Sequence, residues 1–269
     1  MRAGRDDVVP GLVTLEWVED SKRKWGEDSP IYRSRVLGEF PDNDDDVLVP
    51  LAWAEEAVRR HDDTKWEGPL RIGLDVARYG PDSTVAVVAS DQGIKQVRRF
   101  RKADTMETAG FALMMMKENP SIEEVRVDAD GLGAGVYDAL NGEIGTSAIE
   151  MRGGMSPMDK ERFLNCRSEW LWNLRTRLAP DSKNPMSIPN DERLIAQLTS
   201  VKWTTNRKGL IQIESKDEIR KRLHCSPDEL DAMAYACADI GQAASVSIDP
   251  SVGYRSNPCL LYTSDAADE

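Results

Sequence analysis

The sequence predicts an α/β domain with a mixed sheet of five strands flanked by helices, preceded by a short N-terminal linker subdomain. Three observations predict it. From residue 70 onward, three β-rich runs are joined by short turns containing Gly, Pro and Asp, which indicates a meander. Helix-like and strand-like runs then alternate to about residue 240. Two of the predicted strands end in an aspartate after an otherwise apolar run.

The first 68 residues differ in pattern from the rest of the chain. Amphipathic helices are expected at 15–26 and 50–60, on either side of an acidic loop at 42–46. The turn signal Glu67-Gly68-Pro69 marks the boundary. We therefore expect a linker subdomain at 1–68 and the sheet domain at 69–245.

The meander predicts strands at 71–77, 83–90 and 94–100. Asp104 and Glu107 have the spacing of a capping box, so a helix is expected to begin there and to end near Lys117. A fourth strand at 123–128, a helix at 133–140 and a fifth strand at 146–151 come next. Together these elements have the order βββαβαβα once the last helix is included.

The last third of the domain is expected to be mainly helical. Apolar residues at helical spacing predict a long helix at 160–178, and a shorter helix is expected at 192–198. The runs 200–204 and 210–214 flank a basic tip and predict a hairpin. Ser226, Pro227 and Glu229 supply a cap, a first helical position and a capping-box acid for a last helix reaching residue 240.

We expect residues 246–269 to be a disordered tail. Its final part, 259–269, fits no element and resembles the translated end of a sequencing adapter, so we interpret it as a scar; the alternative is an acidic tail.

Composition restricts the function classes. The chain has 269 residues, 40% hydrophobic and 30% charged, as in an ordinary soluble domain. It has neither a long apolar run nor a secretory signal, so a cytoplasmic location is expected. Two histidines, and four cysteines without a Cys-x-x-Cys pair, argue against a zinc site. The net charge of −12 argues against a stand-alone nucleic-acid binder but not against a nuclease with an acidic centre.

The acidic residues at the strand ends carry the chemistry. Asp75 and Asp128 each end an apolar strand, where an unpaired carboxylate would be costly to bury. Asp228 and Asp231 lie three residues apart on the last helix and therefore share a face, with Asp231 the favoured ligand. Such carboxylates can hold two hard divalent cations, which predicts metal-dependent phosphodiester hydrolysis.

Further residues are candidates for auxiliary roles. Asp82 and Asp130 are expected to be turn or supporting residues near the site. The densest basic region surrounds the hairpin and precedes the last helix, so we expect it to contact DNA phosphates. Its candidate DNA-binding residues are Lys202, Arg207, Lys208, Lys216 and Lys221.

Four stretches resemble the C-terminal nuclease domain of the large terminase subunit of tailed bacteriophages, a ribonuclease H-like fold. They are GLDVARYGPDST at 73–84, VDADGLGAGVYDAL at 127–140, ESKDEIRKR at 214–222 leading into SPDELDA at 226–232, and the linker-like SPIYRSRVLGEFP at 29–41. The Asp-x-x-Asp-Ala start of the last helix also resembles RuvC-like junction resolvases.

The resemblance implies a DNA endonuclease that cuts concatemeric DNA during genome packaging, with two Mg²⁺ or Mn²⁺ ions held by Asp75, Asp128 and Asp231. It also implies partners: double-stranded DNA, a terminase ATPase domain, a small terminase subunit and a portal, in the cytoplasm of a phage-infected or prophage-carrying host. No Walker A motif occurs, so no ATPase motor is expected in this chain. The alternatives are a junction resolvase, an actin-like ATPase, and a non-catalytic prophage remnant that binds the packaging complex.

Overall fold

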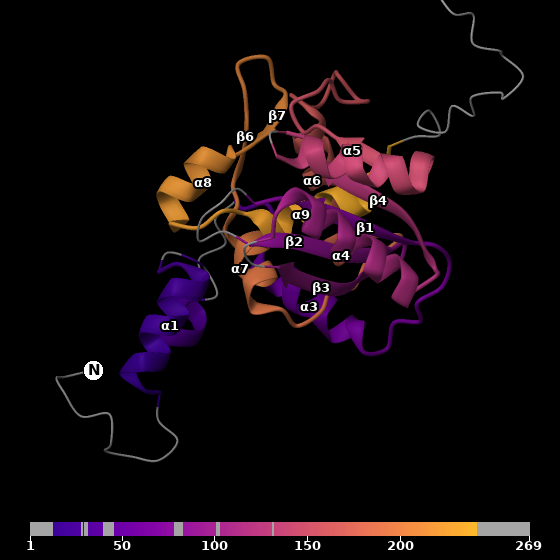
Figure 1. Ribbon diagram of the computed structural model, residues 1–269. Helices are drawn as coiled ribbons and strands as arrows, with labels where there is room; N and C mark the ends of the chain where they lie inside the picture. The colour runs from indigo at the N-terminus through magenta and orange to yellow at the C-terminus, as the bar shows by residue number, and fades with distance from the viewer. Residues whose placement is uncertain are drawn as a thin grey trace, which may run out of the picture. The chain divides into compact units, whose positions relative to one another are not determined.

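The computed structural model of the chain describes residues 13–27, 29, 32–39, 46–77, 83–100, 103–130 and 132–240 (Figure 1). The predicted acidic loop at 42–46, apart from Asp46, lies outside these ranges. So do Asp82 and the whole of the predicted tail at 246–269, including the expected scar.

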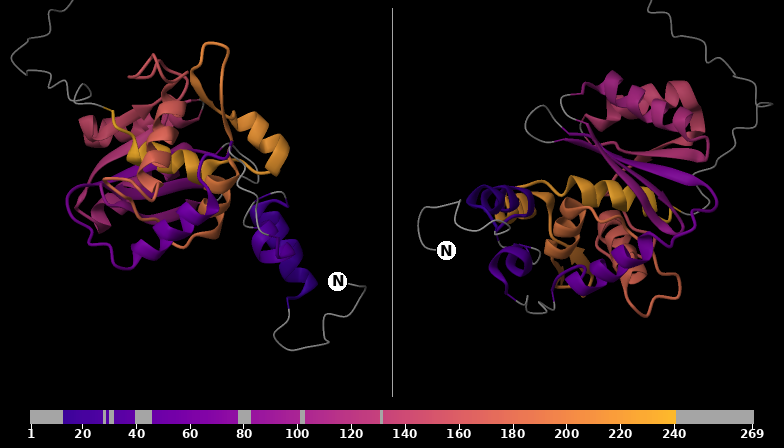
Figure 2. Two further views of the ribbon diagram at one scale, coloured as in Figure 1. Left: turned by 180° about the vertical axis from the view of Figure 1, so that it is seen from behind. Right: turned by 90° about the horizontal axis from the view of Figure 1, so that it is seen from below.

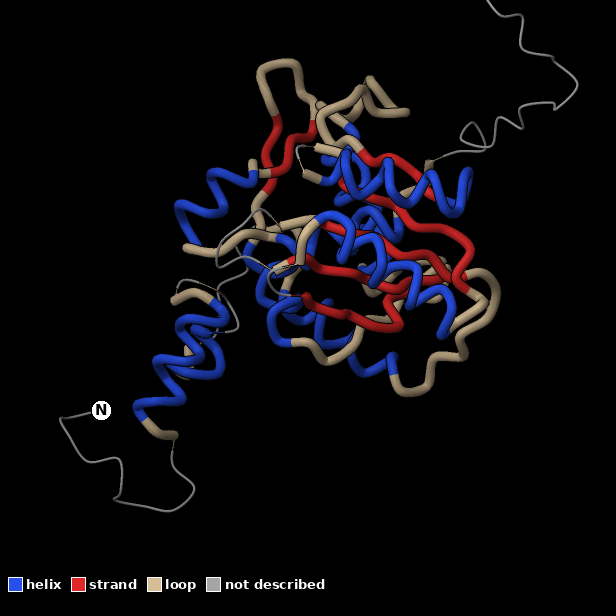
Figure 3. Tube along the Cα trace, in the orientation of Figure 1, coloured by secondary structure: helices blue, strands red, loops and turns tan. Residues whose placement is uncertain are grey.

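The described elements follow the predicted order closely (Figure 3). The helices are α1 (Leu15–Trp25), a π-helical turn η1 (Arg33–Leu37), α3 (Leu51–His61), α4 (Thr105–Glu118), α5 (Gly133–Ile144), a 3₁₀ turn η2 (Gly145–Ser147), α6 (Cys166–Leu178), α7 (Glu192–Ser200), α8 (Lys216–Leu223) and α9 (Asp228–Cys237). The strands are β1 (Leu70–Asp75), β2 (Thr84–Ser90), β3 (Gly93–Phe100), β4 (Ile122–Asp128), β5 (Ala148–Met151), β6 (Trp203–Thr205) and β7 (Ile211–Ile213).

The five-stranded sheet has the order β3-β2-β1-β4-β5. The meander strands β1, β2 and β3 pair antiparallel, whereas β1 with β4 and β4 with β5 pair parallel. Strands β6 and β7 form a separate antiparallel hairpin. The mixed five-stranded sheet flanked by helices is therefore confirmed, as is the capping box of Asp104 and Glu107 that begins α4.

Helices cover both faces of this sheet (Figure 2). Helices α4 and α5 pack on one face, and α9 crosses the other, where α6 and α7 pack against it. Alternate residues of β1 and β4 (Ile72, Leu74, Val125 and Val127) are buried in the core on the α4/α5 side. Because side chains alternate across a strand, Gly73, Asp75 and Asp128 must lie on the α9 side.

Helix α9 approaches the sheet so closely that no side chain fits beneath it. A Cβ atom on Gly73 would lie 2.0 Å from the carbonyl oxygen of Ala232 and 2.4 Å from the backbone nitrogen of Ala236. At the other end of α9, buried Arg126 of β4 donates to the carbonyl oxygens of Tyr235 and Ala238. Arg126 therefore satisfies carbonyl groups that a helix end leaves without partners.

The predicted long helix at 160–178 is wrong in its first part, because α6 begins only at Cys166. The Asn165 side chain accepts a hydrogen bond from the backbone N–H of Ser168 and caps the helix there. Just upstream, Phe163 makes a β-bridge with Ile211 of the hairpin. A long-range backbone contact thus replaces the first helical turns that local periodicity predicts.

The last helix also differs from its prediction. It begins at Asp228 without a side-chain cap and ends at Cys237 rather than at residue 240. Glu229 makes no capping box; it forms an ion pair with Arg99 and accepts a hydrogen bond from Gln197. Helix α8, capped by Ser215 and Glu218, is an element that the sequence pattern did not predict.

The chain up to Asp239 forms one compact unit, in which α1 and α3 pack against α7. The boundary near residue 68 between a linker subdomain and the sheet domain stays a prediction. No helix in the described part of the chain is both long and apolar enough to cross a membrane.

Candidate metal centre

Two aspartates meet at one edge of the sheet. Asp75 ends β1 and Asp128 ends β4, and because these strands are parallel neighbours, their carboxyl ends lie side by side. Both side chains lie on the α9 face, and the residues are only 6% and 7% exposed. Topology and side-chain alternation thus bring together two carboxylates that are 53 positions apart in the sequence.

Helix α9 brings the third carboxylate, and α8 brings a cation. Asp231 lies in the first turn of α9 and is completely buried. The ammonium nitrogen Nζ of Lys216 lies 3.1 Å from Oδ2 of Asp75, 3.2 Å from Oδ2 of Asp128 and 3.1 Å from Oδ2 of Asp231. The three predicted catalytic aspartates therefore surround a single point, which the lysine occupies.

Two other side chains hold the carboxylates in place. The Tyr235 hydroxyl donates a hydrogen bond of 2.8 Å to Oδ2 of Asp128. Arg167 donates from Nε to Oδ1 of Asp231 at 2.9 Å and from Nη1 to the carbonyl oxygen of Glu214 at 2.7 Å. Arg167 therefore connects α6, the segment before α8, and the acidic centre.

Tyr235 and Arg167 were not predicted from the sequence as residues of the site. Tyr235 follows Asp231 by four residues and shares its helix face, so the spacing could have indicated it. Arg167 has no such signal, because its contacts are made across 47 and 64 positions of sequence.

The electrostatics of the centre follow from burial and from the central lysine. Burial raises the pKa of Asp75 well above its usual range, although Lys216 opposes this shift. Burial acts in the same direction on Asp231, but Arg167 and Lys216 together hold its pKa below the usual value. Burial alone would lower the pKa of Lys216, but Asp231, Asp75 and Asp128 raise it. The lysine is therefore a cation held by the carboxylates.

The donor set fits a hard divalent cation. Within the described ranges, no group of three or more His, Cys, Asp or Glu side chains is spaced to hold a metal ion directly. The three Oδ2 atoms lie 3.1–3.2 Å from Nζ of Lys216, whereas Mg²⁺ binds oxygen at roughly 2.1 Å, so a bound ion would draw the carboxylates closer together. Oδ2 of Asp231 is buried and accepts no hydrogen bond, and the positively charged Nζ of Lys216 lies 3.1 Å from it. Carboxylate oxygens around a charged centre are the ligands that Mg²⁺ and Mn²⁺ prefer.

A cavity of about 540 Å³ opens beside the acidic centre. Besides Asp75 and Asp128, its walls include Asp130 and Asp228, two of the predicted ligands or supporting residues. The backbone N–H of Asp130 donates to Oδ1 of Asp128 at 3.1 Å, so Asp130 is directly connected to the site. The glycine at 133 allows this tight turn, because a Cβ atom there would lie 1.6 Å from the Asp128 carbonyl oxygen.

The predicted DNA-binding residues are dispersed. Lys216 lies in the acidic centre, Arg207 and Lys208 are exposed at the hairpin tip, and Lys202 forms an ion pair of 2.9 Å with Asp46. Lys221 is exposed on α8.

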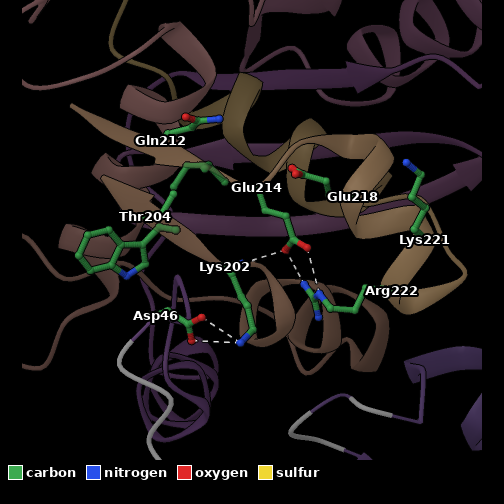
Figure 4. Close-up of a pocket in the computed structure, with 10 residues that line it drawn as sticks. Asp46, Lys202, Thr204, Gln212, Glu214, Glu218, Lys221 and Arg222 are labelled. Carbon is green, nitrogen blue, oxygen red and sulfur yellow. Dashed lines mark hydrogen bonds and ion pairs between the residues drawn. The ribbon is translucent and has the colours of Figure 1, made fainter. Parts of the chain in front are cut away.

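Lys202 and Lys221 line a second cavity of about 560 Å³ (Figure 4). The charges there are largely paired: Figure 4 also shows the Glu214 carboxylate against the Arg222 guanidinium. The second cavity therefore offers less charge for metal or phosphate than the acidic centre does.

The chain is similar to known proteins in sequence and in fold. No protein-family model matches the chain. Over 225 residues, 78% of the chain, it is 24% identical to the "Probable terminase, large subunit" of Enterobacteria phage P7, of which it covers 45%. The chain thus spans less than half the length of that curated relative.

Among solved structures, the nuclease domain of the large terminase subunit gp2 of bacterial virus Sf6 matches 72% of the chain and 100% of its own length, with a TM-score of 0.63 and 21% identity. A mutant of the same domain with manganese matches the same share of the chain with a TM-score of 0.61 and 20% identity. The chain therefore shares its fold with terminase nuclease domains, and the resemblance to large terminase subunits predicted from the sequence is confirmed.

Proposed function

We propose that this chain is a metal-dependent DNA endonuclease of the terminase large subunit type, which cuts concatemeric DNA during genome packaging in the cytoplasm of an infected host cell. The observation that carries the proposal is the meeting of Asp75, Asp128 and Asp231, from three elements, at one point beside an open cavity. The similarity to a phage terminase and the manganese bound by the Sf6 domain support it.

Asp75, Asp128 and Asp231 would hold the cations, and Asp228 at the cavity wall would assist. Two bound divalent cations would supply an activated water and would stabilise the leaving oxygen of a phosphodiester. Tyr235 and Arg167 hydrogen-bond to Asp128 and Asp231 and so restrain the orientation of these two carboxylates.

Lys216 balances the carboxylate charge in the metal-free protein. Its ammonium group lies where the three Oδ2 atoms converge, so a cation must compete with it for these oxygens. The side chain is 32% exposed and can therefore swing toward solvent. We propose that this lysine keeps the site assembled until metal and DNA arrive.

The grip on DNA would come from basic side chains near the site and from partners. Arg207 and Lys208 extend at the tip of the hairpin whose strand β7 lines the cavity. Because the chain carries a net charge of −12, these local contacts must act against long-range repulsion. An ATPase domain, a small terminase subunit and a portal are the partners that this role implies.

The test is nicking of supercoiled plasmid in Mg²⁺ or Mn²⁺. Asp75→Asn, Asp128→Asn and Asp231→Asn should each reduce the rate at least a hundredfold, because each substitution removes a charged metal ligand. Asp62→Asn, whose side chain is fully exposed in the turn after α3, is the matched control and should cut at the wild-type rate.

Metal-independent cutting, or cutting by the Asp128 variant at the rate of the control, would overturn the proposal. Strong preference for four-way junctions over plasmid would instead favour a junction resolvase. Binding to packaging components without any cutting would favour the non-catalytic remnant.

A further inference from the structure

The loop between β5 and α6, part of which lines the acidic cavity, exposes large apolar side chains. We name residues 153–164 the methionine loop. Met155 is 60% exposed and Met158 is 66% exposed, and Leu164 at the end of the loop is also exposed. Single exposed apolar residues are ordinary, but three within ten positions indicate a contact surface.

The backbone of the methionine loop is held in place. The buried carboxylate of Glu169 accepts hydrogen bonds from the backbone N–H groups of Met158 and Asp159, at 2.7 and 3.1 Å. The carbonyl oxygens of Gly153 and Met155 accept hydrogen bonds from the first residues of α6, both at 2.9 Å. The loop therefore presents its exposed methionines from fixed backbone positions.

The methionine loop and the hairpin flank the same cavity. Gly153, Gly154 and Leu164 line it together with Asp75 and Asp128. The loop is bonded to the hairpin, and Figure 1 shows the two side by side. The bonds run from the Leu164 N–H to the Ile211 carbonyl oxygen at 3.0 Å and from the Ile211 N–H to the Arg162 carbonyl oxygen at 2.8 Å.

The chemistry of the loop fits sugars and base edges rather than phosphates. Its ionic side chains balance, with Asp159 and Glu161 against Lys160 and Arg162. Methionine is flexible and polarizable, and proteins that contact the minor groove use such apolar side chains against it. The basic hairpin tip next to the loop can supply the phosphate contacts that the loop does not.

We propose that Met155 and Met158 pack into the minor groove of the duplex whose phosphate lies at the acidic centre, so that the methionine loop adds affinity for the duplex. This inference rests on the proposed nuclease function. Contacts of this kind are non-ionic, so they should add affinity without adding to the salt dependence of binding.

The test measures binding of a fluorescent 20-base-pair duplex to the full chain in Ca²⁺ between 50 and 200 mM salt. Met155→Ser with Met158→Ser should weaken binding about tenfold at every salt concentration, since roughly 1.4 kcal/mol corresponds to a factor of ten. The slope of log Kd against log salt should stay unchanged. Under Mn²⁺, KM for cleavage should rise by a similar factor, while kcat at saturating DNA should fall less than twofold.

The matched control is Met106→Ser with Met114→Ser. These exposed methionines lie on α4, on the other side of the sheet from α9, and their substitution should leave Kd unchanged. Equal melting temperatures of both double variants and wild type establish that folding is intact.

Wild-type affinity of the Met155/Met158 variant, with cleavage by the wild-type chain intact, would overturn the inference and leave the nuclease function standing. An affinity loss that disappears at high salt, or an equal loss in the α4 control, would also overturn it. A wild-type chain that neither binds nor cuts DNA would overturn both proposals.

Discussion

Replacing the lysine at the acidic centre separates its structural role from the metal chemistry. In Lys216→Ala, the Oδ2 atoms of Asp75, Asp128 and Asp231 lose the only ammonium group that lies within 3.2 Å of all three in the described structure. Breaking a buried ion pair costs about 3–5 kcal/mol. Because the Lys216 side chain is 32% exposed, we expect Lys216→Ala to lower the free energy of unfolding by less than this, about 2 kcal/mol.

In a domain of this size, that cost lowers the melting temperature of the metal-free protein by about 4–8 °C. Mn²⁺ should reverse the loss, because the variant offers the carboxylates without a competing ammonium group. Stabilisation by a ligand grows as RT ln(1 + [L]/Kd), so a tenfold lower Kd adds about 1.4 kcal/mol at saturating metal.

The assay is a melting curve over a Mn²⁺ titration, with Lys221→Ala, an exposed lysine on the same helix, as the control. A variant as stable as wild type without metal, and with no larger shift on adding Mn²⁺, would refute the charge-balancing role.

Three further outcomes are expected. Gly73→Ala would place a methyl group 2.0 Å from the carbonyl oxygen of Ala232 in α9. The substitution should lower the free energy of unfolding by about 3 kcal/mol, measured by melting, and should abolish nicking of plasmid. For Asp191, burial alone would raise the pKa, but hydrogen bonds from Arg99 lower it. The wild-type chain should therefore be more stable than Asp191→Asn above about pH 4, where the carboxylate is ionised in both the folded and the unfolded chain. This difference in the free energy of unfolding, measured by urea titration, should disappear as the pH falls through the pKa of Asp191 in the folded protein. Arg207→Ala with Lys208→Ala should lower the salt slope of DNA binding by about two units.

The chain offers controls for the first two of these outcomes. Gly142→Ala on α5 meets open space, so it should be neutral or stabilising; a cost equal to that of the Gly73 variant would contradict the packing argument. Asn at 191 keeps the cap of α7, so a stability difference that does not change with pH would contradict the ion-pair argument.

The sheet and the approximate position of its acids can be predicted from the amino-acid sequence alone. Asp75 and Asp128 could be predicted as neighbours because each ends an apolar run, and strand order places parallel strand ends at the same edge. Asp231 could be predicted because small residues follow it on a helix that packs tightly. These signals are local or periodic, so they are readable without coordinates.

The groups that balance the charge of those acids and orient them are apparent only in the folded structure. Lys216 belongs by sequence to a basic surface run, yet from the first position of α8 its side chain reaches the acidic centre. The contacts of Arg167 with Glu214 and Asp231, and those of the methionine loop with Ile211, each span more than 45 positions of sequence. Such contacts depend on which surfaces meet after the chain has folded, and they leave no periodicity in the sequence from which they could be predicted.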